Sequence, residues 1–361
     1  MKKEVSLYLD AVRFLAALTV FFAHYSTNSL GGGFLWQFSH YGHQAVTVFF
    51  ILSGFVIAYA TDTRENSAGA YCVSRIARMY SVVVPAVILT AALDALGAWL
   101  RPDLYTRAWG FEADLSAFRF FAALTFSNEL WTLSVKQGSN LAYWSMGYEV
   151  PYYVIFGLAL FAPAKWRAVS VGAALLAAGP SIAVMCPVWL AGVAVYRICK
   201  RDVVSVRWGV LLFTASLLAW GTYEWIAWNY GRPMLQTGPL FKRAEVIQDY
   251  IVACFFCAGL IGFNAAAHEL GGLLLRFARP IRWLAGASFT LYLCHLPLAR
   301  FLLACTPWPK EAVASRSLVI GGTLVLVFMI AAVTERKKEA WRRAVTPVWD
   351  WLFARRGVPH A

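Results

Sequence analysis

The sequence predicts an all-α integral membrane protein, a polytopic bundle of about ten transmembrane helices with both termini in the cytoplasm. Three observations lead to this prediction. Hydrophobic residues make up 60% of the 361 residues and charged residues only 14%, whereas globular chains carry about 25% charged residues. The apolar residues form runs of about 20, the length that crosses a bilayer. The basic residues lie mainly in the breaks between these runs, mostly on one predicted side of the membrane.

The predicted spans follow from the apolar runs in chain order. They are residues 7–26, 43–61, 79–100, 143–162, 168–184, 187–199, 208–228, 246–267, 283–304 and 314–334. The two short spans, 168–184 and 187–199, are expected to join near Met185, Cys186 and Pro187. We expect one membrane-embedded domain at residues 1–334 and a basic cytoplasmic tail at residues 335–361. The first run lacks a small-residue cleavage site, so it is expected to stay as the first span.

The distribution of basic residues sets the expected orientation. The chain has 32 Lys and Arg against 19 Asp and Glu, a net charge of +13. With ten spans, 21 basic residues face the side of the N-terminus, nine face the other side, and Arg13 and Arg300 lie within spans. Because basic residues collect on the cytoplasmic side, this ratio places both termini there. The same pattern explains the positive charge without nucleic-acid binding.

The first span contains three ionisable residues, and such residues inside a transmembrane helix mark functional sites by default. Arg13 and His24 are 11 residues apart, which places them on one helix face, about 16 Å apart along the axis. Asp10 lies within about 40° of that face and can pair with Arg13 at i, i+3. The alternatives are a structural ion pair for Asp10 and Arg13, and for His24 an interfacial histidine that is hydrogen-bonded to a loop.

Two further groups lie on the second and third spans. Arg75 and Arg78 are i, i+3 neighbours at the inner end of the third span, where paired guanidinium groups suit phosphate. Anchoring at the cytoplasmic interface is the alternative interpretation. Ser53 beside Gly54 forms a small patch at which another helix can approach closely.

Glu149 and His295 lie on later spans. Glu149 is expected near the outer end of the span 143–162, at the depth of His24, where its carboxylate could orient the imidazole. The alternative is a helix-end carboxylate that faces the outer loop.

His295 lies near the middle of its span, before Pro297, and a buried histidine bonded to a neighbouring helix is the favoured interpretation. No His, Cys, Asp and Glu residues have metal-ligand spacing, so no metal is expected.

Five motifs in chain order together resemble the membrane-bound acyltransferase family 3. Residues 9–17 followed by His24 are similar to its R-x10-H signature, and residues 48–55 to its second-helix motif. Residues 75–78 match its R-x-x-R. Trp144, Ser145 and Glu149 with residues 152–153, and the segment 292–295, resemble its later signatures. The resemblance covers about residues 6 to 334.

This resemblance implies a bacterial inner-membrane enzyme that transfers acyl groups, usually acetyl from acetyl-CoA, to sugars of exopolysaccharides, lipopolysaccharide O-antigens or related glycans. Some members carry a fused SGNH domain, which is not expected here. The expected partners are acyl-CoA, a glycan or lipid-linked sugar and membrane lipid. The expected catalytic residues are His24, Glu149 and Asp10; those expected to bind CoA are Arg13, Arg75 and Arg78; and the supporting residues are Ser53, Tyr292 and His295.

Two other classes of function fit a bundle with buried charges. A transporter or flippase for a lipid-linked glycan or small solute would move its substrate without consuming acyl-CoA. The sequence shows no clear inverted repeat of the kind that many transporters carry. A membrane sensor or assembly subunit without catalysis is the third class.

Overall fold

The structure, a computed structural model, describes residues 1–106, 111 and 117–353. No β-strand occurs in these ranges, where the isolated bridge joins Gln137 and Asn140. The predicted all-α class is confirmed. The helices are α1 (Lys3–Tyr25), α2 (Tyr41–Thr63), α3 (Ala68–Leu100), α4 (Ala117–Leu124), α5 (Met146–Phe161), α6 (Ala164–Ala178), α7 (Pro180–Arg201), α8 (Val206–Tyr230), α9 (Val246–Ala265), α10 (Ala267–Leu270), α11 (Gly272–Arg276), α12 (Ala278–Ala285), α13 (Ser288–Ala304), α14 (Val313–Val333) and α15 (Lys338–Phe353). The 3₁₀ helices between them include η4 (Leu141–Ser145) and η5 (Glu335–Lys337).

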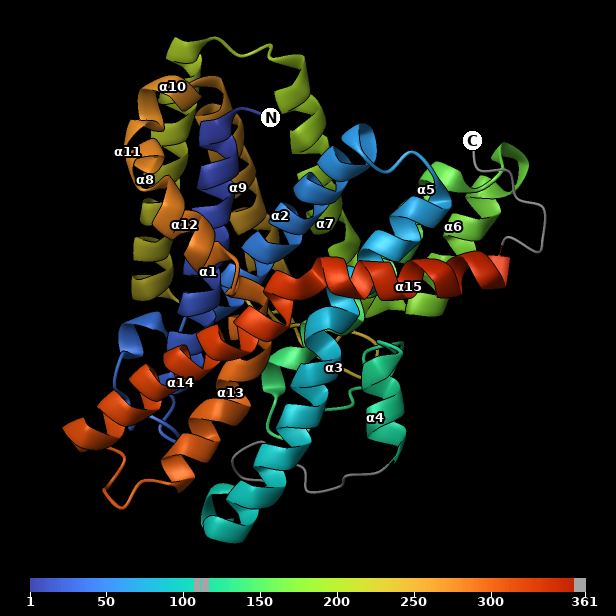
Figure 1. The fold of residues 1–361 in the computed structure, drawn as a ribbon. Helices are drawn as coiled ribbons and strands as arrows, with labels where there is room; N and C mark the ends of the chain where they lie inside the picture. The colour runs from blue at the N-terminus through green and yellow to red at the C-terminus, as the bar shows by residue number, and fades with distance from the viewer. Residues whose placement is uncertain (107–110, 112–116, 354–361) are drawn as a thin grey trace. The chain divides into compact units, whose positions relative to one another are not determined.

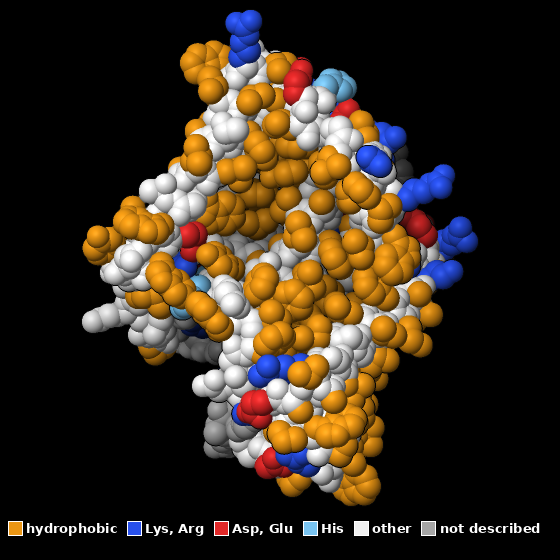
Figure 2. All heavy atoms as spheres, turned by 90° about the vertical axis from the view of Figure 1, so that its left-hand side faces the viewer, with side chains coloured by type: hydrophobic (Ala, Val, Ile, Leu, Met, Phe, Trp, Pro, Cys, Tyr) orange, Lys and Arg blue, Asp and Glu red, His pale blue; other side chains and the backbone are white. Residues whose placement is uncertain are grey.

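The multi-pass membrane class is also confirmed. Among the described residues, seven helices are long and apolar enough to cross a membrane, and the bent pair α12 and α13 makes an eighth if it is one span. Ten spans were predicted; two of them, 143–162 and 168–184, correspond to α5 and α6, which have only 16 and 15 residues. Hydrophobic side chains cover most of the face shown in Figure 2, as expected of a surface that lies against lipid.

One predicted helix break is wrong. The sequence places a break near Met185 to Pro187, but α7 continues through Pro187. The break lies instead at Gly179, which has φ of 90° and is followed by Pro180 in the first turn of α7. Glycine takes this backbone conformation without strain, and proline at the first helical position loses no intrahelical hydrogen bond. Pro187 is tolerated because membrane helices accommodate internal prolines.

The helices form two compact units. The first comprises residues 1–16, 43–64 and 179–285, and the second comprises residues 17–42, 65–178 and 286–361. In the first unit, α8 and α9 lie side by side (Figure 1). In the second, α13 lies against α3 and α14, and α15 lies against α3. Helix α15 belongs to the predicted tail, of which residues 354–361 lie outside the described residues.

Helices α2 and α7 of the first unit meet at two glycines. A Cβ atom on Gly54 would press into the carbonyl oxygen of Trp189, and one on Gly192 would press into that of Ile51. Beside this contact, the indole Nε1 of Trp189 donates a hydrogen bond to Ser53 Oγ at 3.2 Å. The predicted small patch at Ser53 and Gly54 therefore is a site of close helix approach.

The close approach predicts a large difference between two glycine substitutions. Gly54→Ala places a methyl group inside the contact distance of a backbone carbonyl, so we expect it to destabilise the protein by about 1–3 kcal/mol or more. Gly221→Ala on α8 is the control, because nothing lies within 4 Å of its added Cβ. We expect the control to unfold at or above the wild-type temperature. Equal unfolding temperatures for the two variants in detergent would contradict the close approach.

Candidate active site: an imidazole pair in the second unit

Two histidines that are 271 positions apart in the sequence form a direct contact. His24 lies in the last turn of α1, and His295 lies in the middle of α13 with no exposed surface. His24 Nδ1 and His295 Nε2 are 2.9 Å apart. The two rings are nearly parallel, with 5.1 Å between their centroids. The interpretation of His295 as a buried histidine bonded to another helix is correct, and its partner is His24.

The hydrogen-bond pattern fixes which nitrogen carries each proton when both rings are neutral. His295 Nδ1 lies 2.9 Å from the carbonyl oxygen of Leu291, which can only accept, so this nitrogen is the donor. His295 Nε2 then has a lone pair and accepts a hydrogen bond from His24 Nδ1–H. It follows that His24 Nε2 is the basic nitrogen of the pair. These proton positions are assigned from the hydrogen-bond network.

The imidazole pair packs against an aromatic side chain. The ring of Phe21, one turn before His24, lies 5.7 Å from the ring of His295 and is 1% exposed. In such surroundings a hydrogen bond between two polar groups is stronger than in water. A base that is oriented by a second group is the arrangement that activates a hydroxyl or thiol nucleophile. His24 can therefore serve as a general base through Nε2, with His295 behind it.

The segment 137–145 packs against the helix that carries His295. The hydroxyl of Tyr292 lies 2.7 Å from Ser145 Oγ and 3.1 Å from the carbonyl oxygen of Ala142. Asn140 Nδ2 donates to the carbonyl oxygen of Leu293 at 2.7 Å. The structure thus brings together two motif segments, the one around Ser145 and the one at residues 292–295, which the sequence keeps apart.

Glu149 lies in the first turn of α5 and accepts a hydrogen bond from the hydroxyl of Tyr153, one turn later. His24 meets His295 rather than Glu149 at Nδ1. The group that holds the His24 ring is therefore a second imidazole, where the sequence analysis expected a carboxylate. A role for Glu149 in the reaction stays a prediction.

The two arginines of the R-x-x-R motif have different surroundings. Arg75 is buried, forms an ion pair with buried Glu65 and lies over the rings of Tyr71 and Tyr153. Arg78, one turn later, is partly exposed, and among the described residues no ion pair involves its side chain. Of the two, Arg78 is better placed to bind an external phosphate. Arg75 would first have to break its ion pair with Glu65.

The polar groups at the start of α1 belong to the first unit. Arg13 Nη2 donates a hydrogen bond to Asp10 Oδ1 at 2.8 Å, the expected i, i+3 ion pair. About a quarter of the Arg13 side chain is exposed and about a fifth of that of Asp10. The guanidinium group can therefore still bind a second anionic group. Among the described residues, no group of three His, Cys, Asp or Glu side chains could hold a metal ion.

Comparison with known proteins identifies the family. Residues 6–335 match the family model described as an acyltransferase domain. The chain belongs to this family, acyltransferase 3. This acyltransferase is also similar to the exopolysaccharide production protein ExoZ of Rhizobium meliloti (strain 1021), with 30% identity over 129 residues. That alignment covers 35% of this chain and 37% of ExoZ, so the chain matches less than half of its relative. No solved structure matches it.

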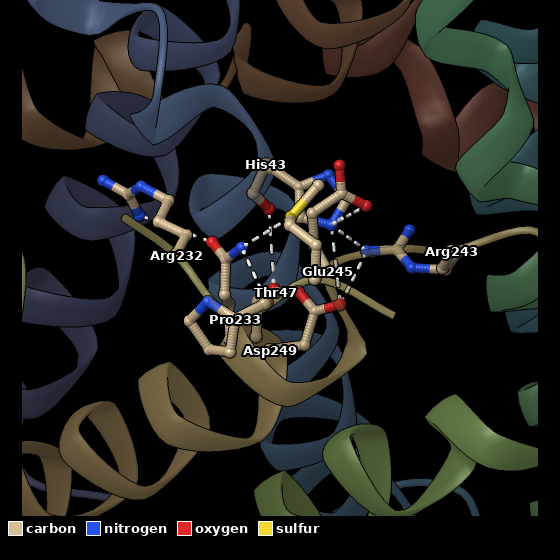
Figure 3. Close-up of polar contacts among 9 residues, drawn as sticks. His43, Thr47, Arg232, Pro233, Arg243, Glu245 and Asp249 are labelled. Carbon is tan, nitrogen blue, oxygen red and sulfur yellow. Dashed lines mark hydrogen bonds and ion pairs between the residues drawn. The ribbon is translucent and has the colours of Figure 1, made fainter. Parts of the chain in front are cut away.

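The acyltransferase has a second polar cluster, in the first unit, that the sequence did not predict (Figure 3). Asp249 in the first turn of α9 is 1% exposed and binds Arg243 at 2.9 Å. It also accepts a hydrogen bond from Thr47, and His43 Nε2 lies 3.5 Å from it. Glu245 lies 3.7 Å from His43. Asp249 falls inside the predicted apolar span 246–267. A single carboxylate within an apolar span was the sequence feature that could have indicated this cluster.

Further polar contacts beside this cluster join the loop before α9 to α8 and α7. Arg232 binds Glu224 on α8 at 2.6 Å, and Glu224 in turn accepts a hydrogen bond from Gln44 on α2, also at 2.6 Å. Ser181 Oγ donates to the carbonyl oxygen of Leu240 at 2.6 Å. Because nearly every charge in this cluster has an opposite charge beside it, the cluster holds the loop in place on the ends of α2, α8 and α9.

Proposed function

We propose that this protein is a bacterial inner-membrane O-acyltransferase that moves an acyl group, acetyl as the first candidate, from cytoplasmic acyl-CoA to a hydroxyl of an exopolysaccharide or related glycan. Membership of the acyltransferase family supports transfer of an acyl group. The printed name of ExoZ supports a glycan acceptor. The observation that carries the chemistry is the imidazole pair, which leaves a basic nitrogen on His24.

The proposed step balances in protons and bonds. His24 Nε2 takes the proton of the acceptor hydroxyl while the oxygen of that hydroxyl attacks the carbonyl carbon of the thioester. The carbon–sulfur bond breaks, and the CoA sulfur leaves with the proton from His24. The products are an ester on the glycan and free CoA. His295 accepts the hydrogen bond of His24 Nδ1–H throughout, and it steadies the imidazolium that forms in the transition state.

The donor-binding residues are assigned from charge and exposure. Arg78 would bind a phosphate of CoA in the first half of α3, and Arg13, held by Asp10, would meet the donor along α1. Arg75, with Glu65, would shape the same part of α3. Mass spectrometry of the surface glycans of cells with and without the protein tests the proposal. We expect acyl esters that disappear on deletion and return with the wild-type gene; unchanged acylation would contradict it.

The two arginines give a matched pair of variants. Arg78→Gln removes a charge that is partly exposed, so we expect the KM for acyl-CoA to rise about tenfold, the equivalent of about 1.4 kcal/mol, with the unfolding temperature unchanged. Arg75→Gln leaves buried Glu65 without its cation, so we expect a loss of stability of about 3–5 kcal/mol. Steady-state kinetics and thermal unfolding of purified protein separate the two effects. An unchanged KM in Arg78→Gln would remove this residue from the donor site.

A further inference from the structure

A buried carboxylate that the sequence analysis passed over lies in the second unit. Asp94 on α3 is 1% exposed, and its Oδ2 accepts a hydrogen bond from the backbone N–H of Ser139 at 2.8 Å. The preceding residue, Gly138, has φ of 54°, and a Cβ atom there would collide with the same oxygen. Arg300, which is 2% exposed, attracts this carboxylate electrostatically. The turn at residues 138–139 therefore rests directly on a buried charge of α3.

The segment that begins at this turn reaches the catalytic histidines through α13. Asn140, next to Ser139, donates to the carbonyl oxygen of Leu293. Tyr292 contacts Ser145 and the carbonyl oxygen of Ala142 at the far end of the segment. His295 follows one turn after Leu291 and Tyr292 on the same helix, and it holds the ring of His24. Asp94 is thus connected to the ring of His24 through the turn at Ser139, helix α13 and His295.

We propose that Asp94 is a positioning residue for the imidazole pair: it holds the turn at Ser139, and the turn holds α13 at the position from which His295 accepts the hydrogen bond of His24. This inference rests on the proposed function. The interaction that places the turn is acceptance of one N–H, so the turn requires an oxygen at this position, and the loss of the charge beside Arg300 acts on stability instead. Asparagine can supply that oxygen, and alanine cannot.

Three variants on α3 test this role by kinetics. We expect Asp94→Ala to lower kcat more than tenfold with the KM for acyl-CoA within twofold, and Asp94→Asn to recover kcat to within about threefold of wild type. Thr90→Val is the matched control. Thr90 is as buried as Asp94 and lies one turn earlier, and within the described part of the chain its hydroxyl donates to the carbonyl oxygen of Ala86, on its own helix. Its kcat should equal that of the wild type. Wild-type kcat in Asp94→Ala, or equal losses in the alanine and asparagine variants, would overturn the proposal.

A spectroscopic measurement separates this inference from the proposed function. Protein labelled with ¹⁵N-histidine should show an imidazole–imidazole hydrogen bond that is absent in a His295→Ala reference. We expect Asp94→Ala to weaken or lose this signal and Asp94→Asn and Thr90→Val to retain it. A variant Asp94→Ala that keeps the signal unchanged would overturn the positioning role even if it were inactive. The signal does not depend on any reaction, so an absence of acyl transfer in the wild type would refute the proposed function alone.

Discussion

Replacing His24 by alanine is expected to reduce acyl transfer by about 10²–10⁴-fold, the usual contribution of a general base. The substitution removes Nε2, the basic nitrogen that the hydrogen bonds from His24 to His295 and from His295 to Leu291 leave available. Transfer is measured with radiolabelled acetyl-CoA and purified acceptor glycan. The amount of inserted protein is measured in parallel, because loss of a ring that packs against His295 can also lower stability.

His268→Ala is the matched control for this experiment. The side chain of His268 is 77% exposed and lies beside Glu4 in the first unit, whereas the imidazole pair belongs to the second. We expect it to transfer acyl groups at the wild-type rate. If His24→Ala acylated the glycan as fast as this control, His24 would not be the base.

Replacing His295 should affect the reaction through His24. Without His295, His24 loses the imidazole acceptor at Nδ1 and keeps the backbone carbonyl of Val20, so its proton is held less firmly away from Nε2, the nitrogen that has to accept one. We therefore expect His295→Ala to lower kcat by about 10²-fold, the lower end of the range for general-base catalysis. The KM for acyl-CoA should change little, because neither ring is assigned to the donor.

His295→Gln separates orientation from the filling of space. The glutamine amide oxygen can accept the hydrogen bond from His24 Nδ1–H, so we expect it to restore at least a tenth of the wild-type kcat. Steady-state kinetics of the two variants at several pH values gives the comparison. Equal kcat values for the alanine and glutamine variants would show that His295 acts by packing and not by holding the tautomer.

The sequence predicted the features of this protein that depend on local patterns. Apolar runs predicted most of the long helices, among them the helix that carries both Arg13 and His24. The small patch at Gly54 predicted the contact that α7 makes with α2. Each of these features follows from residues that are close in the sequence, where hydrophobicity and helical period determine the outcome.

The features that the sequence did not predict depend on packing between distant segments. The partner of His24 lies 271 positions away, and nothing in the spacing along one helix distinguishes His295 from Glu149 as that partner. Asp94 lies inside an apolar run, and the turn at Ser139 that donates a hydrogen bond to it is 45 positions away. The break at Gly179 was not predicted because the sequence analysis took Pro187 as the end of a helix. A proline can, however, lie inside a membrane helix, as Pro187 does in α7.

The most direct test of the imidazole pair as the centre of an acyltransferase follows the label of acetyl-CoA in proteoliposomes. The wild-type protein, reconstituted with acceptor glycan, receives acetyl-CoA labelled in the acetyl group, and free CoA and glycan-bound ester are both counted. We predict one labelled ester for each CoA released, and the loss of both in His24→Ala. Glycan that crosses the membrane while acetyl-CoA stays intact, in the wild type and His24→Ala alike, would contradict this account.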